Sequence, residues 1–299
     1  MPVVANTLKT YTQVGKKEDI EDIIYDISPT LTPFTSSIGT STASATLHQW
    51  QQSELSAVGT NAAVEGADAG AASNNTTTLK NANTQIFTKV VQSSGTSEAV
   101  ETYGRNSDLQ MNIAMKGKEM RRDIEHAFVG ALQAGNPGNG TTARELKSAQ
   151  NQIDASTTST AGSNRAFSET LLLGVLQDVY EAGGDPNQIQ VTPSHSVLVA
   201  NFAAAAGRER DFSTGTKIVN SVDLYVSPFG ECSVVPNRFL QANTCLVLDT
   251  EYWSRAVLRP MQTIVLAKQG DSDKRQMLTE LTLVCENDKA SGLIEALTA

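Results

Sequence analysis

The sequence predicts an α+β fold. Three observations predict it: one unusually long amphipathic helix, a long arm with few large apolar side chains, and a region in which helices alternate with short strands. The chain has 299 residues, which is enough for one or two domains with a real core. Its hydrophobic content of 39% and charged content of 18% are low for a compact enzyme, so we expect much of the chain to be extended.

The long helix is expected over Ser107–Ala134. Ser107 is a good N-cap, and Gly135 and Pro137 predict the end of the helix, because glycine suits a left-handed cap and proline cannot continue a helix. At ~1.5 Å per residue this helix is roughly 40 Å long. Gly117, in its middle, predicts a bend or a close contact. The apolar stripe contains Leu109, Ile113, Met120, Ile124, Phe128 and Ala131.

The opposite face of this helix is predicted to be charged and exposed. Arg121 and Glu125 are one turn apart, so they can form an ion pair. Such a pair stabilises a helix by at most about a few tenths of a kcal/mol. The charged face contains Lys116, Lys118, Arg122 and Glu125.

The first part of the chain is predicted to be an arm. Met1–Gly15 shows little periodicity and is expected to be extended. Lys17–Ile27 is expected to be helical or mixed, because its isoleucines share one face. Ser28–Phe34 has two prolines four residues apart, which favour an extended or turn geometry. Phe34 and Ile38 would then dock the arm onto a core.

Thr40–Thr84 is predicted to be a second, longer arm. It has six large apolar side chains in 45 residues, and its flanks, Ala43–Gln52 and Leu79–Gln92, have strand character. Glu65–Ala72 is expected to be the tip of the loop. An isolated hairpin is at best marginally stable in water, so this arm either rests on a neighbouring subunit or is a disordered insertion.

The next segments lead into and out of the long helix. Thr84–Ser97 is expected to be a strand, with Ile86 and Val90 on one face and Phe87 and Val91 on the other. After the helix, the polar stretch 136–165 is expected to have a short ordered element over Leu146–Ile153 and a mobile loop after it.

The region Phe167–Ala267 is predicted to be of mixed α/β type. Ser168 and Ser194 are expected to cap its two helices. Lys274–Glu286 alternates as a long strand, and Asn287–Ala299 is expected to be a short tail. The other strands are expected at Gln188–Thr192, Lys217–Asn220, Leu224–Ser227, Cys232–Val235, Thr244–Asp249 and Trp253–Val265.

Charge and cysteine content limit the function classes. The formal net charge of −9 argues against binding nucleic acid by neutralising phosphates, although it does not exclude enclosing nucleic acid. The three cysteines form no CxxC pair and are expected to be reduced and buried. The N-terminus does not resemble a signal peptide, and no apolar run is long enough to span a membrane. We therefore expect no membrane partner and a protein that is made and kept in a cytoplasm-like setting.

A search for catalytic or binding motifs finds none. A nucleophilic triad needs a histidine, and His48, His126 and His195 have no GxSxG motif beside them. Asp123, Glu125 and His126 have the wrong spacing to bind one metal ion from a single helix face. No P-loop, GxGxxG or HExxH motif is present. We therefore predict no catalytic residue, no metal site and no cofactor.

The order of these segments resembles the Hong Kong 97-type capsid fold of tailed bacteriophages. Five segments look like a branch of phage major capsid proteins, and the likeness spans nearly the whole chain. They are DIIYDISPTLTPFTSSIG (Asp22–Gly39), HQW (His48–Trp50), NANTQIFTKVVQSSGTSEAV (Asn81–Val100), RRDIEHAF (Arg121–Phe128) and LAKQGDSDKRQMLTELTLVCEN (Leu266–Asn287).

This resemblance implies four regions. Residues 1–39 would be the N-terminal arm, and residues 40–84 would be the E-loop, which reaches over an adjacent subunit. The P-domain would comprise residues 85–165 and 268–299 around the spine helix 107–134. The A-domain, residues 166–267, would point to the five- or six-fold axes.

The function implied is that of a non-enzymatic major capsid protein. It would self-assemble in the host bacterial cytoplasm into the pentamers and hexamers of an icosahedral virion head, which encloses double-stranded DNA without sequence-specific binding. Scaffold, cement and portal proteins are further candidate partners. Some relatives crosslink an E-loop lysine, but Lys80 is at the base of the loop, so no crosslink is expected. The candidate inter-subunit contacts are Phe34, Trp50, Leu55, Val58, Leu79 and Lys80.

Three alternatives remain open from the sequence. One is a phage tail or decoration protein, which would form rings or bind a pre-made shell. The same fold serves as the shell of an encapsulin-like nanocompartment that encloses an enzyme. A protein of a different class, a small hydrolase with an unrecognised site, would be a stable monomer that turns over a model ester.

Overall fold

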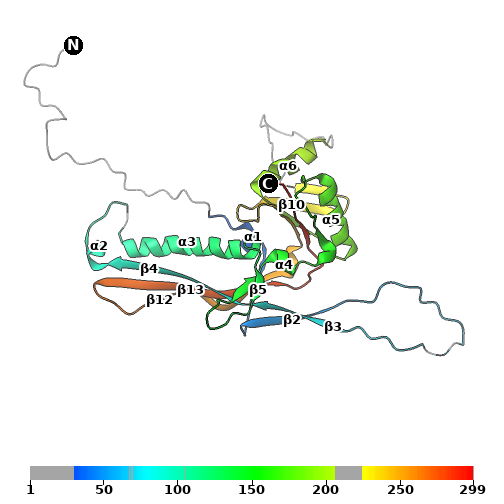
Figure 1. Cartoon of the computed structure of the whole chain (residues 1–299), viewed down its shortest axis with the longest axis horizontal. Coiled ribbons are helices and arrows are strands. Elements are labelled where there is room, and N and C mark those ends of the chain that lie inside the picture. The colour runs from blue at the N-terminus through cyan, green and yellow to red at the C-terminus, as the bar shows by residue number, and fades with distance from the viewer. Residues whose placement is uncertain (1–29, 67, 69, 105, 206–223, 299) are drawn as a thin grey trace, which may run out of the picture.

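The computed structural model describes residues 30–66, 68, 70–104, 106–205 and 224–298. The predictions for Met1–Gly15, Lys17–Ile27 and Lys217–Asn220 concern residues outside this part. Figure 1 shows a long helix lying along a sheet, a second α/β body at one end, and a thin arm that extends well beyond both. In the described residues, no helix is long and apolar enough to cross a membrane.

The long helix is α3, which spans Asp108–Val129. As predicted, Ser107 is its N-cap, and the side chain of Ser107 accepts a hydrogen bond from the backbone N–H of Gln110 (3.2 Å). The predicted end at Ala134 is wrong, because the C-cap is Gly130. A Cβ atom at Gly130 would lie 2.4 Å from the carbonyl oxygen of Phe239, so close packing requires glycine where the helix ends.

The helix lies on a four-stranded sheet with the order β1-β12-β13-β4. β13 runs antiparallel to both β12 and β4, so the strands expected at Thr84–Ser97, Trp253–Val265 and Lys274–Glu286 lie in one sheet. Gly117 has the predicted close contact: a Cβ atom there would lie 3.4 Å from the terminal methyl of Met277. The strands are β1 (Gly39–Thr42), β4 (Gln85–Ser94), β12 (Trp253–Val265) and β13 (Ser272–Cys285).

The core between helix and sheet is aromatic at one end. Phe34, Met120, Phe128 and Trp253 are all fully or almost fully buried there. The ring of Phe34 lies edge-on to Phe128 and to Trp253, with centroid distances of 6.0 and 5.8 Å. This cluster anchors the N-terminal stretch to the helix and to the sheet.

A six-stranded sheet forms the second body, with the order β7-β14-β11-β8-β10-β9. Helices α5 (Glu169–Glu181) and α6 (Pro193–Ala205) flank it, and α5 has the predicted cap, because Ser168 Oγ accepts from the N–H of Leu171 (3.4 Å). The strands are β7 (Thr158–Ser159), β8 (Gln188–Val191), β9 (Leu224–Ser227), β10 (Gly230–Pro236), β11 (Cys245–Leu248) and β14 (Gly292–Ile294).

Three local predictions are wrong. Ser194 does not cap α6, because the helix begins at Pro193 and the N–H of His195 donates to Thr192 Oγ1 (3.3 Å). The proline-rich stretch is not extended at Pro33, because this proline occupies the first turn of α1 (Pro33–Ser37), where its missing N–H costs no hydrogen bond. The tail after Asn287 is not peripheral, because β14 pairs with β11 inside the six-stranded sheet.

The strand pairing also changes the regional boundaries expected from the sequence. β12 lies within the expected region 166–267, yet it pairs along its length with β13, and its first part pairs with β1, beneath the long helix. Conversely, β14 was grouped with the helix-bearing region, yet it pairs in the six-stranded sheet. Pairing partners distant in the chain decide membership of a sheet, and local patterns do not reveal them.

Short elements connect these layers. The stretch after α3 has β5 (Ala134–Asn136), β6 (Glu145–Lys147), α4 (Ala149–Gln152) and the 3₁₀ turn η2 (Ala155–Thr157), which includes the ordered element expected over Leu146–Ile153. The expected mobile loop after it includes η2 and β7, which pairs with β14. α2 (Gly95–Ala99) precedes α3, and the 3₁₀ turn η3 (Thr250–Tyr252) precedes β12.

Candidate assembly surfaces

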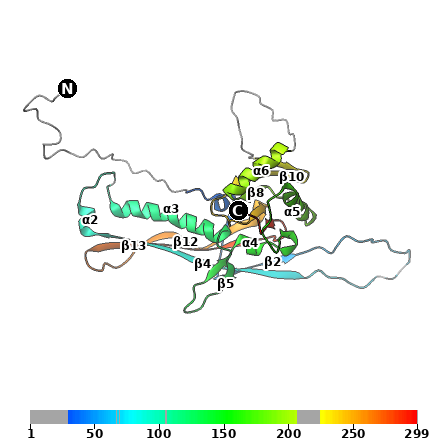
Figure 2. The same ribbon diagram turned by 45° about the horizontal axis from the view of Figure 1, so that its top comes forward.

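The long arm is a two-stranded hairpin that leaves the body of the protein. β2 (Leu47–Ser53) and β3 (Thr77–Asn83) pair antiparallel, and residues 54–76 form the open end. Figures 1 and 2 show from two directions that this end projects away from both sheets. The side chains of Leu55, Val58 and Val64 are 91, 104 and 81% exposed. The arm therefore presents apolar side chains that no described part of its own chain covers.

The base of the arm is fixed to the body by polar contacts. Lys80 Nζ lies 2.6 Å from Asp288 Oδ2, and Gln52 Nε2 donates to the carbonyl of Glu286 (2.8 Å). Lys289 and Glu54 form a further ion pair. These contacts place Lys80 at the base of the arm, as predicted, and engage it within its own chain.

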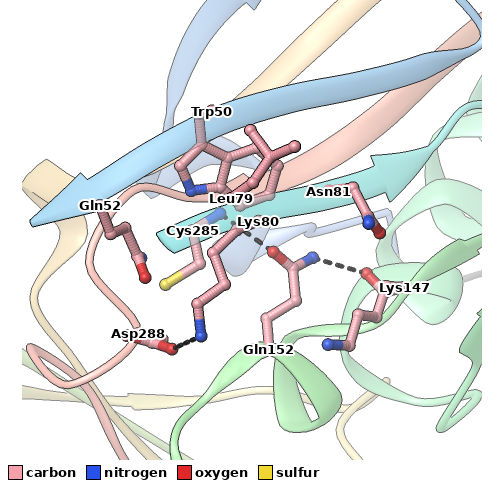
Figure 3. Close-up of a pocket in the computed structure, with 9 residues that line it drawn as sticks. All are labelled: Trp50, Gln52, Leu79, Lys80, Asn81, Lys147, Gln152, Cys285 and Asp288. Carbon is pink, nitrogen blue, oxygen red and sulfur yellow. Dashed lines mark hydrogen bonds and ion pairs between the residues drawn. The ribbon is translucent and has the colours of Figure 1, made fainter. Parts of the chain in front are cut away.

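A pocket lies beneath the base of the arm, and Figure 3 shows the residues that line it. Gln152 bridges two strands there, because its amide donates to the carbonyls of Lys147 (2.8 Å) and Leu283 (3.1 Å) and accepts from the N–H of Cys285 (3.0 Å). Burial, together with the positive charge of Lys80, lowers the pKa of Lys147. These bonds hold α4, β6 and β13 together beneath the arm.

The six candidate contact residues fall into four environments. Phe34 is fully buried in its own core, so its side chain presents no surface to another subunit in this structure. Trp50 is half-buried at the pocket, and its indole N–H is buried without a hydrogen-bond partner among the described residues. Lys80 lies at the base of the arm. The exposed members, Leu55, Val58 and Leu79, are free to meet another copy.

The sheet beneath the long helix has one open face. Along β4, Phe87 and Val91 point to the helix, and Ile86 and Val90 alternate with them. Ile86 and Val90 are 46 and 45% exposed, and Ile264 of β12 is 40% exposed on the same side. The alternation of Ile86 and Val90 with Phe87 and Val91 was visible in the sequence, so the signal for this surface was available.

Glu125 is the residue whose role the sequence most clearly misassigned. It was expected on the exposed face in an ion pair with Arg121, but it is fully buried. Its carboxylate accepts hydrogen bonds from the N–H groups of Phe34 and Thr35 (both 2.8 Å), from Thr35 Oγ1 (2.5 Å) and from Asn237 Nδ2 (2.7 Å). Thr32, the N-cap of α1, makes no side-chain cap of its own, so Glu125 caps α1 from a distance.

The three histidines lie in separate environments. His195 is fully buried, with Nδ1 2.9 Å from Thr192 Oγ1 and Nε2 2.9 Å from the carbonyl of Thr298. His126 is exposed on α3 and His48 lies in the arm. Within the described ranges, no group of three or more His, Cys, Asp and Glu side chains is arranged to hold a metal ion.

Comparison with known proteins agrees with this geometry. A family model described as SU10 major capsid protein matches residues 4–298. A major capsid protein of Escherichia phage Phieco32 is 27% identical over 341 residues, which cover 95% of each chain.

Solved structures share the fold at low sequence identity. A capsid of a native GTA particle has a TM-score of 0.68 at 9% identity and covers 97% of both chains. The capsid of cyanophage A-1(L) has a TM-score of 0.66 at 14% identity, covering 97% of this chain and 99% of that one. The SrpI encapsulin of Synechococcus elongatus PCC 7942 has a TM-score of 0.57 at 8% identity over 92% of both chains.

The phage capsids and the encapsulin share the fold, whereas the family model and the curated relative concern phage capsids alone. The fold is therefore of the Hong Kong 97 type, and the chain belongs to the SU10 major capsid protein family, the structural proteins that form phage capsids.

Proposed function

We propose that this capsid protein assembles into the pentamers and hexamers of an icosahedral phage head that encloses double-stranded DNA, and that its role is structural rather than enzymatic. The exposed arm is the observation that carries the proposal. A hairpin with fully exposed Leu55 and Val58 gains stability only when another surface covers these side chains. A second copy of the chain supplies such a surface.

The open sheet face is the surface that suits the arm. It carries Ile86, Val90 and Ile264, all partly exposed and on the side of the sheet that α3 leaves uncovered. An arm that lies on the neighbour's face gives each subunit at least two partners. Many modest contacts then add to a stable shell.

The charge supports enclosure of DNA without binding to it. A net charge of −9 gives no basic wall, so packed DNA would meet little electrostatic attraction from the shell. Host cytoplasmic assembly, and contacts with scaffold, cement and portal proteins, belong to the same proposal.

Electron microscopy of the purified protein, with and without the arm, tests the proposal. We expect full-length protein to form closed shells, and a variant lacking residues 57–76 to stay folded and soluble without forming shells. Full-size shells from the deletion variant would contradict the role of the arm.

A milder variant separates the apolar contacts from the length of the arm. Replacing Leu55, Val58 and Val64 with serine keeps the length but removes the exposed apolar surface, and we expect assembly to fail. The matched control replaces three exposed alanines of the same loop with serine, and we expect it to assemble normally. The control positions are Ala62, Ala63 and Ala72.

The encapsulin-like alternative is supported by the structural similarity to the SrpI encapsulin. The contents of the shell distinguish this alternative from a phage head. Particles formed during infection should contain double-stranded DNA that is protected from nuclease. Particles that instead hold a protein cargo would favour the nanocompartment. A stable monomer that hydrolyses a model ester would favour the hydrolase and refute the structural role.

A further inference from the structure

A groove runs between α1, the long helix α3 and β12, on the helix-bearing side of the four-stranded sheet. Its volume is about 540 Å³. Ile124, Val257 and Leu281 form an apolar floor, and the side chain of Met261 at its edge is 43% exposed. The groove is thus apolar inside and open to solvent.

Two arginines line this groove, and neither forms an ion pair within the described part of the chain. Arg121 loses its expected partner because Glu125 turns inward to cap α1. Arg255 donates only to the hydroxyl of Thr40 (2.9 Å). An apolar groove with two unpaired guanidinium groups suits an occupant that is both apolar and acidic.

The chain contains a segment with this chemistry. Residues 17–27 combine four isoleucines, spaced for one face of a helix, with five carboxylates. The isoleucines are Ile20, Ile23, Ile24 and Ile27, and the acidic residues are Glu18, Asp19, Glu21, Asp22 and Asp26.

The connection between segment and groove is short. The described chain begins at residue 30, and Thr32 already lines the groove. Thr32 is the fifth residue after Ile27, and an extended chain covers roughly 17 Å over five residue steps at ~3.3–3.6 Å per residue. A tether of this length gives the segment a high effective concentration at its own groove.

We propose that residues 17–27 dock into this groove on their own chain. The isoleucines pack on the floor of Ile124 and Leu281, and the carboxylates pair with Arg121 and Arg255. Docking covers the apolar floor and neutralises both guanidinium groups. This inference rests on the groove and the sequence of the segment, and it does not depend on the proposed function.

Disulfide trapping in the full-length chain tests the docking. Ile24→Cys is combined with Met261→Cys at the edge of the groove, and the three native cysteines do not interfere because they are buried. We expect rapid formation of a disulfide within one chain. The matched control combines Ile24→Cys with Val90→Cys, whose parent side chain is 45% exposed on the opposite face of the sheet, and we expect it to react at least tenfold more slowly.

Two outcomes would overturn the proposal. Equal trapping at positions 261 and 90 would show that the segment does not select the groove. A disulfide between two chains would show that another copy fills it. A separate chain with Val64→Cys and Met261→Cys tests whether the other copy uses its long arm instead, because trapping between copies of this chain would place the tip of the arm in the groove.

Charge reversal supplies a second measurement, which does not depend on one cysteine pair. Arg121→Glu with Arg255→Glu should reduce trapping at least tenfold, and adding Asp22→Lys with Asp26→Lys should restore it. Unchanged trapping after the double reversal would refute the ion pairs. Circular dichroism of each variant confirms that the body remains folded.

Discussion

Replacement of Glu125 with alanine is the sharpest test of how the N-terminal stretch is held. The wild-type carboxylate accepts from two backbone N–H groups of α1, from Thr35 Oγ1 and from the amide of Asn237, at 2.5–2.8 Å. Alanine leaves these donors without an acceptor in a site with no exposed surface at residue 125. Removing one member of such a buried network costs about 3–5 kcal/mol of unfolding free energy.

The assay is urea unfolding of the unassembled subunit, combined with hydrogen exchange at α1. We expect the midpoint to fall and the amides of Phe34 and Thr35 to exchange faster. Glu125→Gln should lower the free energy of unfolding by less, about 1–3 kcal/mol, because one acceptor oxygen remains. The remaining cost arises because the new amide N–H groups face other donors.

Glu119→Ala is the matched control on the same helix. Glu119 is half-exposed, with its carboxylate 2.8 Å from Lys116 Nζ and 3.8 Å from Lys89 Nζ, so its loss should cost under about 1 kcal/mol. If Glu125→Ala destabilised the subunit no more than this control, the inference that a buried carboxylate holds α1 would be refuted.

Three further predictions concern the helix and its sheet. Ile124→Asp places a charge at a buried position and should cost roughly 3–5 kcal/mol in urea unfolding, so an unchanged midpoint would show an exposed site. Gly117→Ala should raise the free energy of unfolding by up to about 1 kcal/mol, because the nearest atom, 3.4 Å away, is the flexible end of Met277; a loss of stability would mean that Met277 cannot move. Burial raises the pKa of Glu280, but the hydrogen bond from Thr84 and the interactions with Arg259 and Arg144 outweigh it, so the net pKa lies below its ordinary 4.5. Its stabilisation is therefore present above about pH 4.5 and lost on further acidification, and the pH dependence of unfolding should be shallower in Glu280→Gln.

Local sequence signals predicted the elements that local physics determines. The cap at Ser107 and the alternation along residues 85–94 both follow from residues near one another in the chain. The long exposed arm followed from the scarcity of apolar side chains between Thr40 and Thr84.

The failures share a different cause, because each depends on a distant partner. The spacing of Glu125 from Arg121 is typical of an exposed ion pair on a helix. Glu125 is instead a buried cap because its carboxylate binds the N–H groups of Phe34 and Thr35, which lie about 90 residues earlier in the chain. Residue 130, where the helix ends, has room only for glycine because the carbonyl of Phe239 lies against it. β14 becomes a sheet strand through pairing with β11.

The groove and the open face differ in how far sequence could predict them. The apolar residues of the open face were visible in the alternation of β4, although the absence of a covering element among the described residues was not. The groove forms where α1, α3 and β12 meet. Arg121 has no ion-pair partner among the described residues because the carboxylate of Glu125 binds the N-terminus of α1 instead. Such a site appears only in three dimensions.

The position of Glu125 also has a mechanical consequence. Its carboxylate holds the N-terminal stretch, and the amide of Asn237 that binds it also donates to Gln190 Oε1 of the six-stranded sheet (3.1 Å). One side chain on α3 thus joins the N-terminal stretch to the six-stranded body. Tension applied to the N-terminal stretch or to the six-stranded body would pass through the hydrogen bonds of Glu125 and Asn237. A displacement of one of these parts is therefore transmitted to the other while these bonds are intact.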